Sequence, residues 1–198
     1  PRVAPDGTRI AVTRLPVPFA GLELWVYDAA RGRGSRLGRS RRAAAWTHDS
    51  ERVAFLRKAE IVSQPADGSS PAEHIQTAIP ADHFFLNSFS LDGRSLLGVM
   101  EEDILLLPTE GDPIPVVATP FDDRHPVLSP DGIWLAYASN ETGQFEVYVQ
   151  CYPDGQKKRL VSTDGGRAPV WSPDGRELFY RVSNGDTVMA GSFGRGPR

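Results

Sequence analysis

A turn sequence that recurs five times constrains this chain more than any other feature. In each copy an apolar or aromatic residue is followed by Ala, Ser or Thr, a variable residue, Asp, and Gly or Ser. The copies lie at residues 3–7, 46–50, 89–93, 128–132 and 171–175. Their aspartates are separated by 43, 43, 39 and 43 residues, so the copies fill the 198-residue chain. Such a period is typical of one supersecondary unit repeated along the chain.

The segments between the turns also repeat, and their patterns are those of β-strands. An alternating apolar run follows each turn, at residues 9–13, 52–56, 95–99, 134–138 and 177–181. A second run follows a variable loop, at residues 23–27, 60–63, 103–107, 146–150 and 187–190. These runs are rich in β-branched and aromatic residues and are bounded by turn formers. With a short third run and the apolar residues before each turn, each repeat predicts four antiparallel strands, and no helix of useful length is expected.

Four-stranded units at a period near 40 residues are typical of a β-propeller. A lone unit would expose two apolar faces, and stacking against its neighbours in a ring covers both. The sequence therefore predicts an all-β fold, a single β-propeller domain over residues 1–198 with five recognisable four-stranded blades. The repeats are approximately residues 1–40, 41–82, 83–121, 122–164 and 165–198.

Composition excludes several other classes of protein. Hydrophobic residues make up 40 % and charged residues 24 % of the chain, which excludes overall disorder. No apolar run is long enough to span a bilayer, so no membrane span is expected in this segment. The formal net charge of −3 gives no reason to expect nucleic acid binding. The single cysteine, Cys151, cannot form a disulfide within the chain.

The Ser-Pro-Asp-Gly turns at residues 129–132 and 172–175, with Trp171 before the second, resemble the repeats of TolB-type propellers. The resemblance covers essentially the whole chain and is strongest over residues 124–189. Residues 128–149 and 162–167 are also similar to the propeller that follows the kinase domain in many bacterial serine/threonine kinases, although no kinase motif is present here. The resemblance implies a sensor or scaffold module of a receptor-like kinase or an exported TolB-like protein. It favours a periplasmic or extracytoplasmic location.

The two ends of the chain depart from the family's pattern. TolB-like propellers commonly have six blades, whereas five are visible here. The first inner strand is reduced to residues 1–4, and residues 191–196 are expected to form a flexible, Gly-rich tail that leaves the fifth blade without its outer strand. Either the five blades close on their own, or the chain is a truncated six-bladed ring. Exposed blade edges are templates for strand pairing, so a homo-oligomer is predicted.

The turn aspartates and tryptophans are expected to be structural because they recur. Each Asp is predicted to cap its own turn by accepting backbone N–H bonds. Trp46 and Trp171 occupy one repeat position and are predicted to pack between adjacent blades. Function is expected elsewhere, in the irregular loops that lead into the inner strands at the mouth of the channel. The candidate ligand-binding residues in these loops are Arg42, Asp82, His83, Asp122, Asp123, Arg124, His125 and Arg167.

Two function classes are compatible with these candidates. The leading interpretation is a non-catalytic module that binds a protein, a peptide or a small ligand at the channel mouth and needs no cofactor. The alternative is a promiscuous hydrolase of esters or phosphoesters, with a divalent metal ion in the channel. Its metal ligands would be His83, Asp122, Asp123 and His125, although no fixed ligand spacing supports that set. No catalytic residues are assigned, because the sequence has no nucleophile elbow, phosphate loop or dinucleotide fingerprint.

Overall fold

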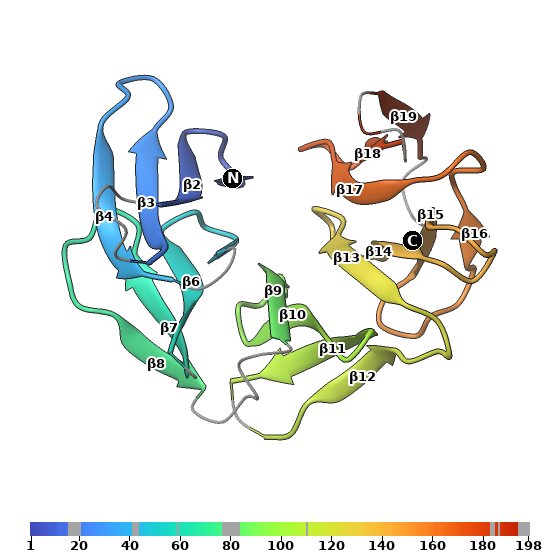
Figure 1. The fold of residues 1–198 in the computed structure, drawn as a ribbon, viewed down its shortest axis with the longest axis horizontal. Coiled ribbons are helices and arrows are strands. Elements are labelled where there is room, and N and C mark those ends of the chain that lie inside the picture. The colour runs from blue at the N-terminus through green and yellow to red at the C-terminus, as the bar shows by residue number, and fades with distance from the viewer. Residues whose placement is uncertain are drawn as a thin grey trace. The chain divides into compact units, whose positions relative to one another are not determined.

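The computed structural model describes residues 1–15, 21–40, 44–58, 60–76, 84–109, 111–182, 185 and 187–193. Within these ranges the chain forms strands and turns without a helix (Figure 1). The strands build five antiparallel sheets, four with four strands and the last with three. The chain divides into two compact units, residues 1–89 and residues 90–198. The all-β prediction and the five repeats are confirmed.

The first unit holds two complete sheets. The first sheet consists of β1 (Arg2–Val3), β2 (Arg9–Arg14), β3 (Glu23–Asp28) and β4 (Gly34–Arg39), and the second of β5 (Ala45–Trp46), β6 (Arg52–Arg57), β7 (Glu60–Pro65) and β8 (Glu73–Gln76). Strand β9 (Phe84–Phe89) ends this unit. Successive side chains of a strand point to opposite faces, so Leu24 and Val26 reach the same core as Phe55 and Val62. Burial of these apolar faces holds the two sheets together.

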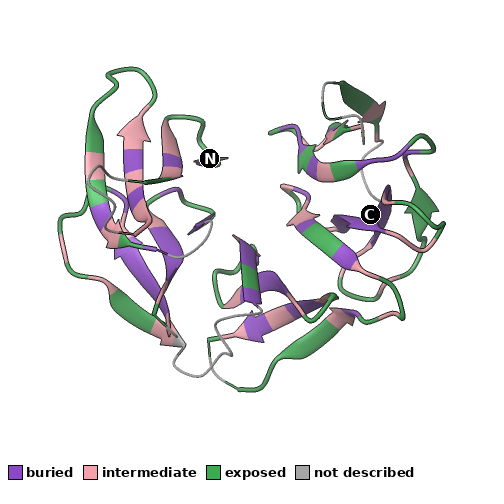
Figure 2. Ribbon diagram, in the orientation of Figure 1, coloured by how far each residue is buried: buried purple, intermediate pink, exposed green. Residues whose placement is uncertain are grey.

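The second unit holds the remaining strands in three sheets. β10 (Ser95–Met100), β11 (Asp103–Pro108) and β12 (Ile114–Val117) form the third sheet in the order β12-β11-β10-β9. The fourth sheet consists of β13 (Asp123–Leu128), β14 (Trp134–Ser139), β15 (Glu146–Cys151) and β16 (Arg159–Leu160), and the fifth of β17 (Arg167–Trp171), β18 (Glu177–Arg181) and β19 (Val188–Ser192). Buried residues concentrate in the middle strands, whereas β12 and β16 are largely exposed (Figure 2).

The fourth sheet is covered on both faces, as stacked blades require. On one face Leu135, Tyr137 and Tyr148 pack against Leu97 and Ile104 of the third sheet. On the other face, alternate residues of the same strands belong to a core that includes Trp171 and Leu178 of the fifth sheet. All six residues of β14 are buried, as is typical of a strand that is covered on both faces.

The recurring turn is held by its aspartate, as predicted, and by a hydroxyl that the sequence analysis did not single out. In the fourth copy, Oδ1 of Asp131 accepts the backbone N–H of Ile133 at 3.1 Å. The hydroxyl of Ser129 donates to the same carboxylate oxygen at 2.5 Å and accepts the backbone N–H of Trp134 at 3.0 Å. Equivalent networks join Thr47 with Asp49, Ser90 with Asp92, and Ser172 with Asp174. The Ser/Thr-x-Asp pattern is therefore a structural signature of the turn in four of the five copies, since the first copy has Ala4 in place of the hydroxyl residue.

The two repeated tryptophans link neighbouring sheets, which confirms the prediction for them. The indole N–H of Trp46 donates to the carbonyl of Arg2 at 3.0 Å. The indole N–H of Trp171 donates to the carbonyl of Val127 at 3.4 Å. In each case the acceptor lies on the first strand of the preceding sheet, 44 residues earlier in the chain. Both rings are buried, so they contribute to the cores between the sheets.

The last sheet has three described strands, and the absence of an outer strand from the fifth blade stays a prediction because residues 194–198 lie outside the described ranges. The predicted tail over residues 191–196 is wrong for its first part, because β19 extends to Ser192. The backbone N–H of Phe193 donates to the carbonyl of Arg176 at 2.7 Å, and its ring packs edge-on against Trp171 at 5.1 Å. These contacts hold the chain against the sheet despite its glycine content. Residues 194–196 lie outside the described ranges.

Candidate functional site

The candidate site lies where β13 and β17, the first strands of two neighbouring sheets, begin. Both strands open with the same irregularity, because their pairing register shifts between Arg124 and Val127 and between Arg167 and Val170. His125 and Ala168, the residues after the two arginines, have φ angles of 54° and 51°. A bulge of this kind bends the strand and redirects the side chains around it. The fourth and fifth repeats therefore each place an arginine directly before a bulge at the start of the first strand.

Arg124 and Arg167 converge on one aromatic ring. The guanidinium carbon of Arg167 lies 4.1 Å from the centre of the Phe145 ring, and that of Arg124 lies 5.7 Å from it. Both distances are within the range of a cation–π interaction. Phe145 immediately precedes β15 and is half-buried, and both exposed arginines contact its ring. Three segments of the second unit thus meet at this cluster, which we call the arginine–phenylalanine cluster (Arg124, Phe145 and Arg167).

Asp122 positions Arg124 within the cluster. Its Oδ1 accepts a hydrogen bond from Nε of Arg124, and its backbone N–H donates to Oδ1 of Asn140 at 2.9 Å. This hydrogen bond and the adjacent negative charge raise the pKa of Arg124. Arg167 has no such neighbour, since no described carboxylate forms an ion pair with it. The two arginines therefore differ, one already paired and the other available to a ligand.

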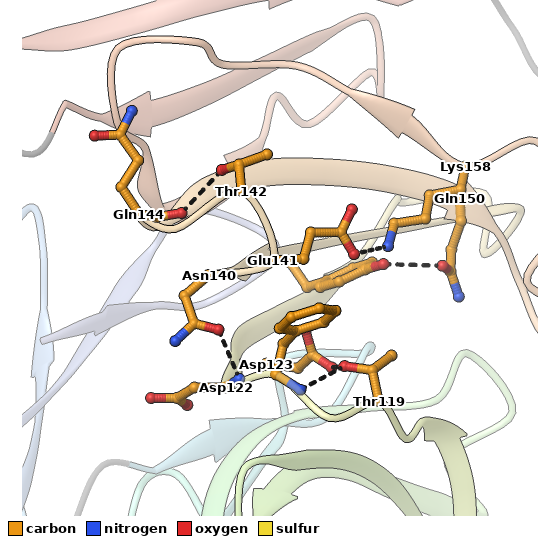
Figure 3. A network of polar contacts seen from close by, with 11 residues as sticks. Thr119, Asp122, Asp123, Asn140, Glu141, Thr142, Gln144, Gln150 and Lys158 are labelled. Atoms are coloured by element: carbon orange, nitrogen blue, oxygen red, sulfur yellow. Dashed lines mark hydrogen bonds and ion pairs between the residues drawn. The ribbon is translucent and has the colours of Figure 1, made fainter.

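Asp123 points away from Asp122, because adjacent residues at the start of a strand face opposite sides (Figure 3). The Asp123 side chain is fully buried, and the hydroxyl of Thr119 donates to its Oδ2 at 2.7 Å. Its other oxygen, Oδ1, is buried without a hydrogen-bond partner among the residues that the structure describes. Desolvation raises the pKa of this carboxyl above its usual value. Asp123 thus belongs to the interior of the fourth sheet rather than to an exposed ligand face.

A second polar network lies on the same face of the fourth sheet (Figure 3). Glu141 forms an ion pair with Lys158, whose ammonium nitrogen lies 4.6 Å from the centre of the Tyr148 ring. The hydroxyl of Tyr137 donates to Oε1 of Gln150 at 3.1 Å. Burial raises the pKa of Tyr148 to about 12, so this phenol is neutral at physiological pH. The network pairs the exposed Lys158 with Glu141 beside a core, whereas the buried Tyr148 hydroxyl has no hydrogen-bond partner among the described residues.

Of the eight predicted site residues, the structure brings together three, which are Asp122, Arg124 and Arg167. Asp123 is buried, and His125 is exposed at the bulge. Arg42, Asp82 and His83 lie outside the described residues. In the described part of the chain, no group of three or more His, Cys, Asp or Glu side chains could hold a metal ion. The four-ligand metal site includes His83, so it stays a prediction.

Phe145 is the residue of this site that sequence reasoning missed. It lies in the variable loop between β14 and β15, where the repeats share no residue type. The available signal is an aromatic residue on a polar loop directly before a strand, since such a ring can take part in a cation–π contact with arginine. Only the tertiary structure shows that two arginines from other segments reach it.

The repeated antiparallel meander and the shared turn define a β-propeller fold. In particular, the fold is that of a TolB-like propeller. A protein assigned as TolB from Agrobacterium tumefaciens has a solved structure that matches 96 % of this chain and 78 % of its own, with a TM-score of 0.72 at 18 % identity. The β-propeller domain of Cps50 (Swd1) from Myceliophthora thermophila matches 91 % of this chain and 61 % of its own, with a TM-score of 0.66 and 11 % identity.

Similarity at the level of sequence covers shorter segments. The Tol-Pal system protein TolB of Actinobacillus succinogenes is 31 % identical over 91 residues, which are 45 % of this chain and 21 % of that protein. The tricorn protease homolog 1 of Streptomyces coelicolor is 32 % identical over 109 residues, which are 50 % of this chain and 10 % of that protein. The chain thus matches about a fifth of the first relative's length and a tenth of the second's. No protein-family model matches the chain.

In the described residues no helix is long and apolar enough to cross a membrane.

Proposed function

We propose that this chain is a non-catalytic binding module that recognises a protein or peptide segment through the residues at the start of the inner strands. The observation that carries the proposal is the arginine–phenylalanine cluster. Two exposed guanidinium groups there come from neighbouring first strands and share one half-buried ring. Arginine and aromatic residues are enriched where proteins bind one another. A TolB-like propeller fold is consistent with this role.

The position of the cluster in the fold supports the same proposal. Blades of a propeller surround a central channel, and β13 and β17 are the first strands of their sheets. Residues at the start of such strands are carried by a rigid scaffold, whereas their side chains remain free to contact a ligand. The parent protein we propose is an exported TolB-like protein or a bacterial receptor-like kinase, in which the module would act as a sensor or scaffold outside the cytoplasm.

An unbiased peptide selection tests this function. Peptides are selected from a random display library against the whole chain, and the bound surface is mapped by hydrogen–deuterium exchange. We expect protection at residues 122–128, 144–146 and 167–171. Protection confined to β16 or β19, or a selection that enriches no peptide, would contradict the proposal.

A further inference from the structure

We infer that the arginine–phenylalanine cluster binds a carboxylate of an acidic peptide segment. The inference rests on the proposed binding function and adds the chemistry of the ligand. The guanidinium groups of Arg124 and Arg167 lie at most about 10 Å apart, because both contact the same ring. Guanidinium groups donate paired, charge-assisted hydrogen bonds that match the two oxygens of a carboxylate.

Arg167 is the principal donor in this inference. Its side chain is exposed, and its guanidinium group lies over the face of the Phe145 ring, which leaves the guanidinium edge and its N–H groups toward solvent. Stacking on a ring restricts a long side chain before a ligand arrives, so less conformational freedom is lost when the ligand binds. Arg167 is therefore both available and partly preorganised.

The charges around Arg124 favour a single carboxylate over a dianionic phosphate. Asp122 already pairs with Arg124, and Glu102 adds a further negative charge in its surroundings. Arg167 thus supplies the charge that a ligand would neutralise. A phosphate monoester carries up to two negative charges at neutral pH, and its second charge would have no unpaired cation in the cluster, since Arg124 is already paired with Asp122. An Asp or Glu side chain brings one charge, which matches the site.

Phe145 adds an apolar contact beside the charged one. The ring is half-buried, so an aliphatic or aromatic residue next to the acidic residue of the peptide would cover its remaining exposed part. Excluding water there would also strengthen the adjacent ion pair. The preferred ligand is therefore an extended segment with an acidic residue followed or preceded by an apolar one.

The two arginines occupy one repeat position, but unlike the recurring turn residues they have no task in the turn or the cores. Arg124 and Arg167 each lie seven residues before the aspartate of the next turn, and both precede a residue with positive φ. Arg42 has the same spacing from Asp49, although it lies outside the described residues. The turn and the cores do not require arginine at this position, because the side chains point to solvent.

Calorimetric titration of the whole chain with paired octapeptides tests the inference. The peptides share apolar neighbours and carry Glu, Gln or phosphoserine at the centre. We expect the Glu peptide to bind at least about tenfold more tightly than the Gln peptide, as a charge-assisted hydrogen bond implies. Arg167→Gln should abolish this difference, and Arg167→Lys should keep part of it because the charge remains. Circular dichroism and the melting temperature establish that each variant is folded.

Arg159 provides the matched control. It is also an exposed arginine of the second unit and lies 5.4 Å from the ring centre of Trp134, but it is on the outer strand β16. Arg159→Gln should leave the preference for Glu unchanged. Equal binding of Glu and Gln peptides at residues 122–128 and 167–171, or a preference that survives Arg167→Gln, would overturn the inference and leave the proposed function standing. A preference for phosphoserine would overturn the carboxylate assignment, and failure of every peptide to bind would count against both.

Discussion

Replacing Ser129 by Ala should destabilise the second unit by about 2 kcal/mol. The hydroxyl is buried, accepts the backbone N–H of Trp134 at 3.0 Å and donates to Asp131 at 2.5 Å. The alanine variant leaves the buried Trp134 N–H without a partner, which costs about 1–3 kcal/mol. The lost bond to Asp131 adds little, because that carboxylate is exposed and can turn to water.

Urea denaturation and scanning calorimetry measure this effect. For a protein of this size, about 2 kcal/mol corresponds to a fall of about 4–8 °C in melting temperature. Ser129→Thr is the control, because Thr47 performs the same role in the second copy and the hydroxyl is retained. A loss below about 0.5 kcal/mol for the alanine variant would refute the assignment of this hydroxyl as a structural partner of Trp134.

Three further predictions concern ionisation and assembly. Burial raises the pKa of Asp123 in the folded protein, so the wild type should lose stability as the pH rises from about 4 through that raised pKa. In chemical denaturation, Asp123→Asn should not show this loss, so it should be more stable than the wild type at pH 7 but not at pH 3.5. Hydrogen bonds from Ser90 and Ser172 lower the pKa values of Asp92 and Asp174, so the two ionised carboxylates should stabilise the fold above about pH 4 and stop doing so as the pH falls through the lowered values. The stability of variants with alanine at these aspartates should therefore depend less on pH during acid unfolding. Val188 is 64 % exposed on the last described strand of the fifth sheet, so light scattering should show association that increases with protein concentration and is weaker in Val188→Lys. A wild type that stays strictly monomeric would contradict this prediction.

The fold could be predicted from the sequence because its determinants are local and repeated. An aspartate that caps its own turn bonds to a backbone N–H two residues later, as Asp131 does with Ile133. The position of the aspartate within the repeated turn is therefore enough to predict this role. The strands follow from alternation of apolar residues between such turns. The end of the chain was less predictable, because Phe193 is held by Trp171, a contact that depends on tertiary packing and outweighs the glycines around it.

The site was less predictable because its members come from separate segments. Aligning the repeats selected Arg124 and Arg167 as candidates, because both lie at the start of an inner strand. Alignment of the repeats could not predict that Asp123 is buried whereas Asp122 is not. Their opposite orientations arise from their places in the strand and from packing of the fourth sheet against the third. Phe145 was missed because its loop has no counterpart in the other repeats.

The most direct test of the binding surface is a nuclear magnetic resonance titration that follows the arginine side-chain Nε–Hε signals. The isotopically labelled whole chain is titrated with the Glu-centred octapeptide, and signals are assigned with single Arg→Gln variants. The account predicts saturable shifts for Arg124 and Arg167 and none for Arg159. Shifts of Arg159 alone, or signals of Arg124 and Arg167 that stay in place while the peptide binds, would contradict it.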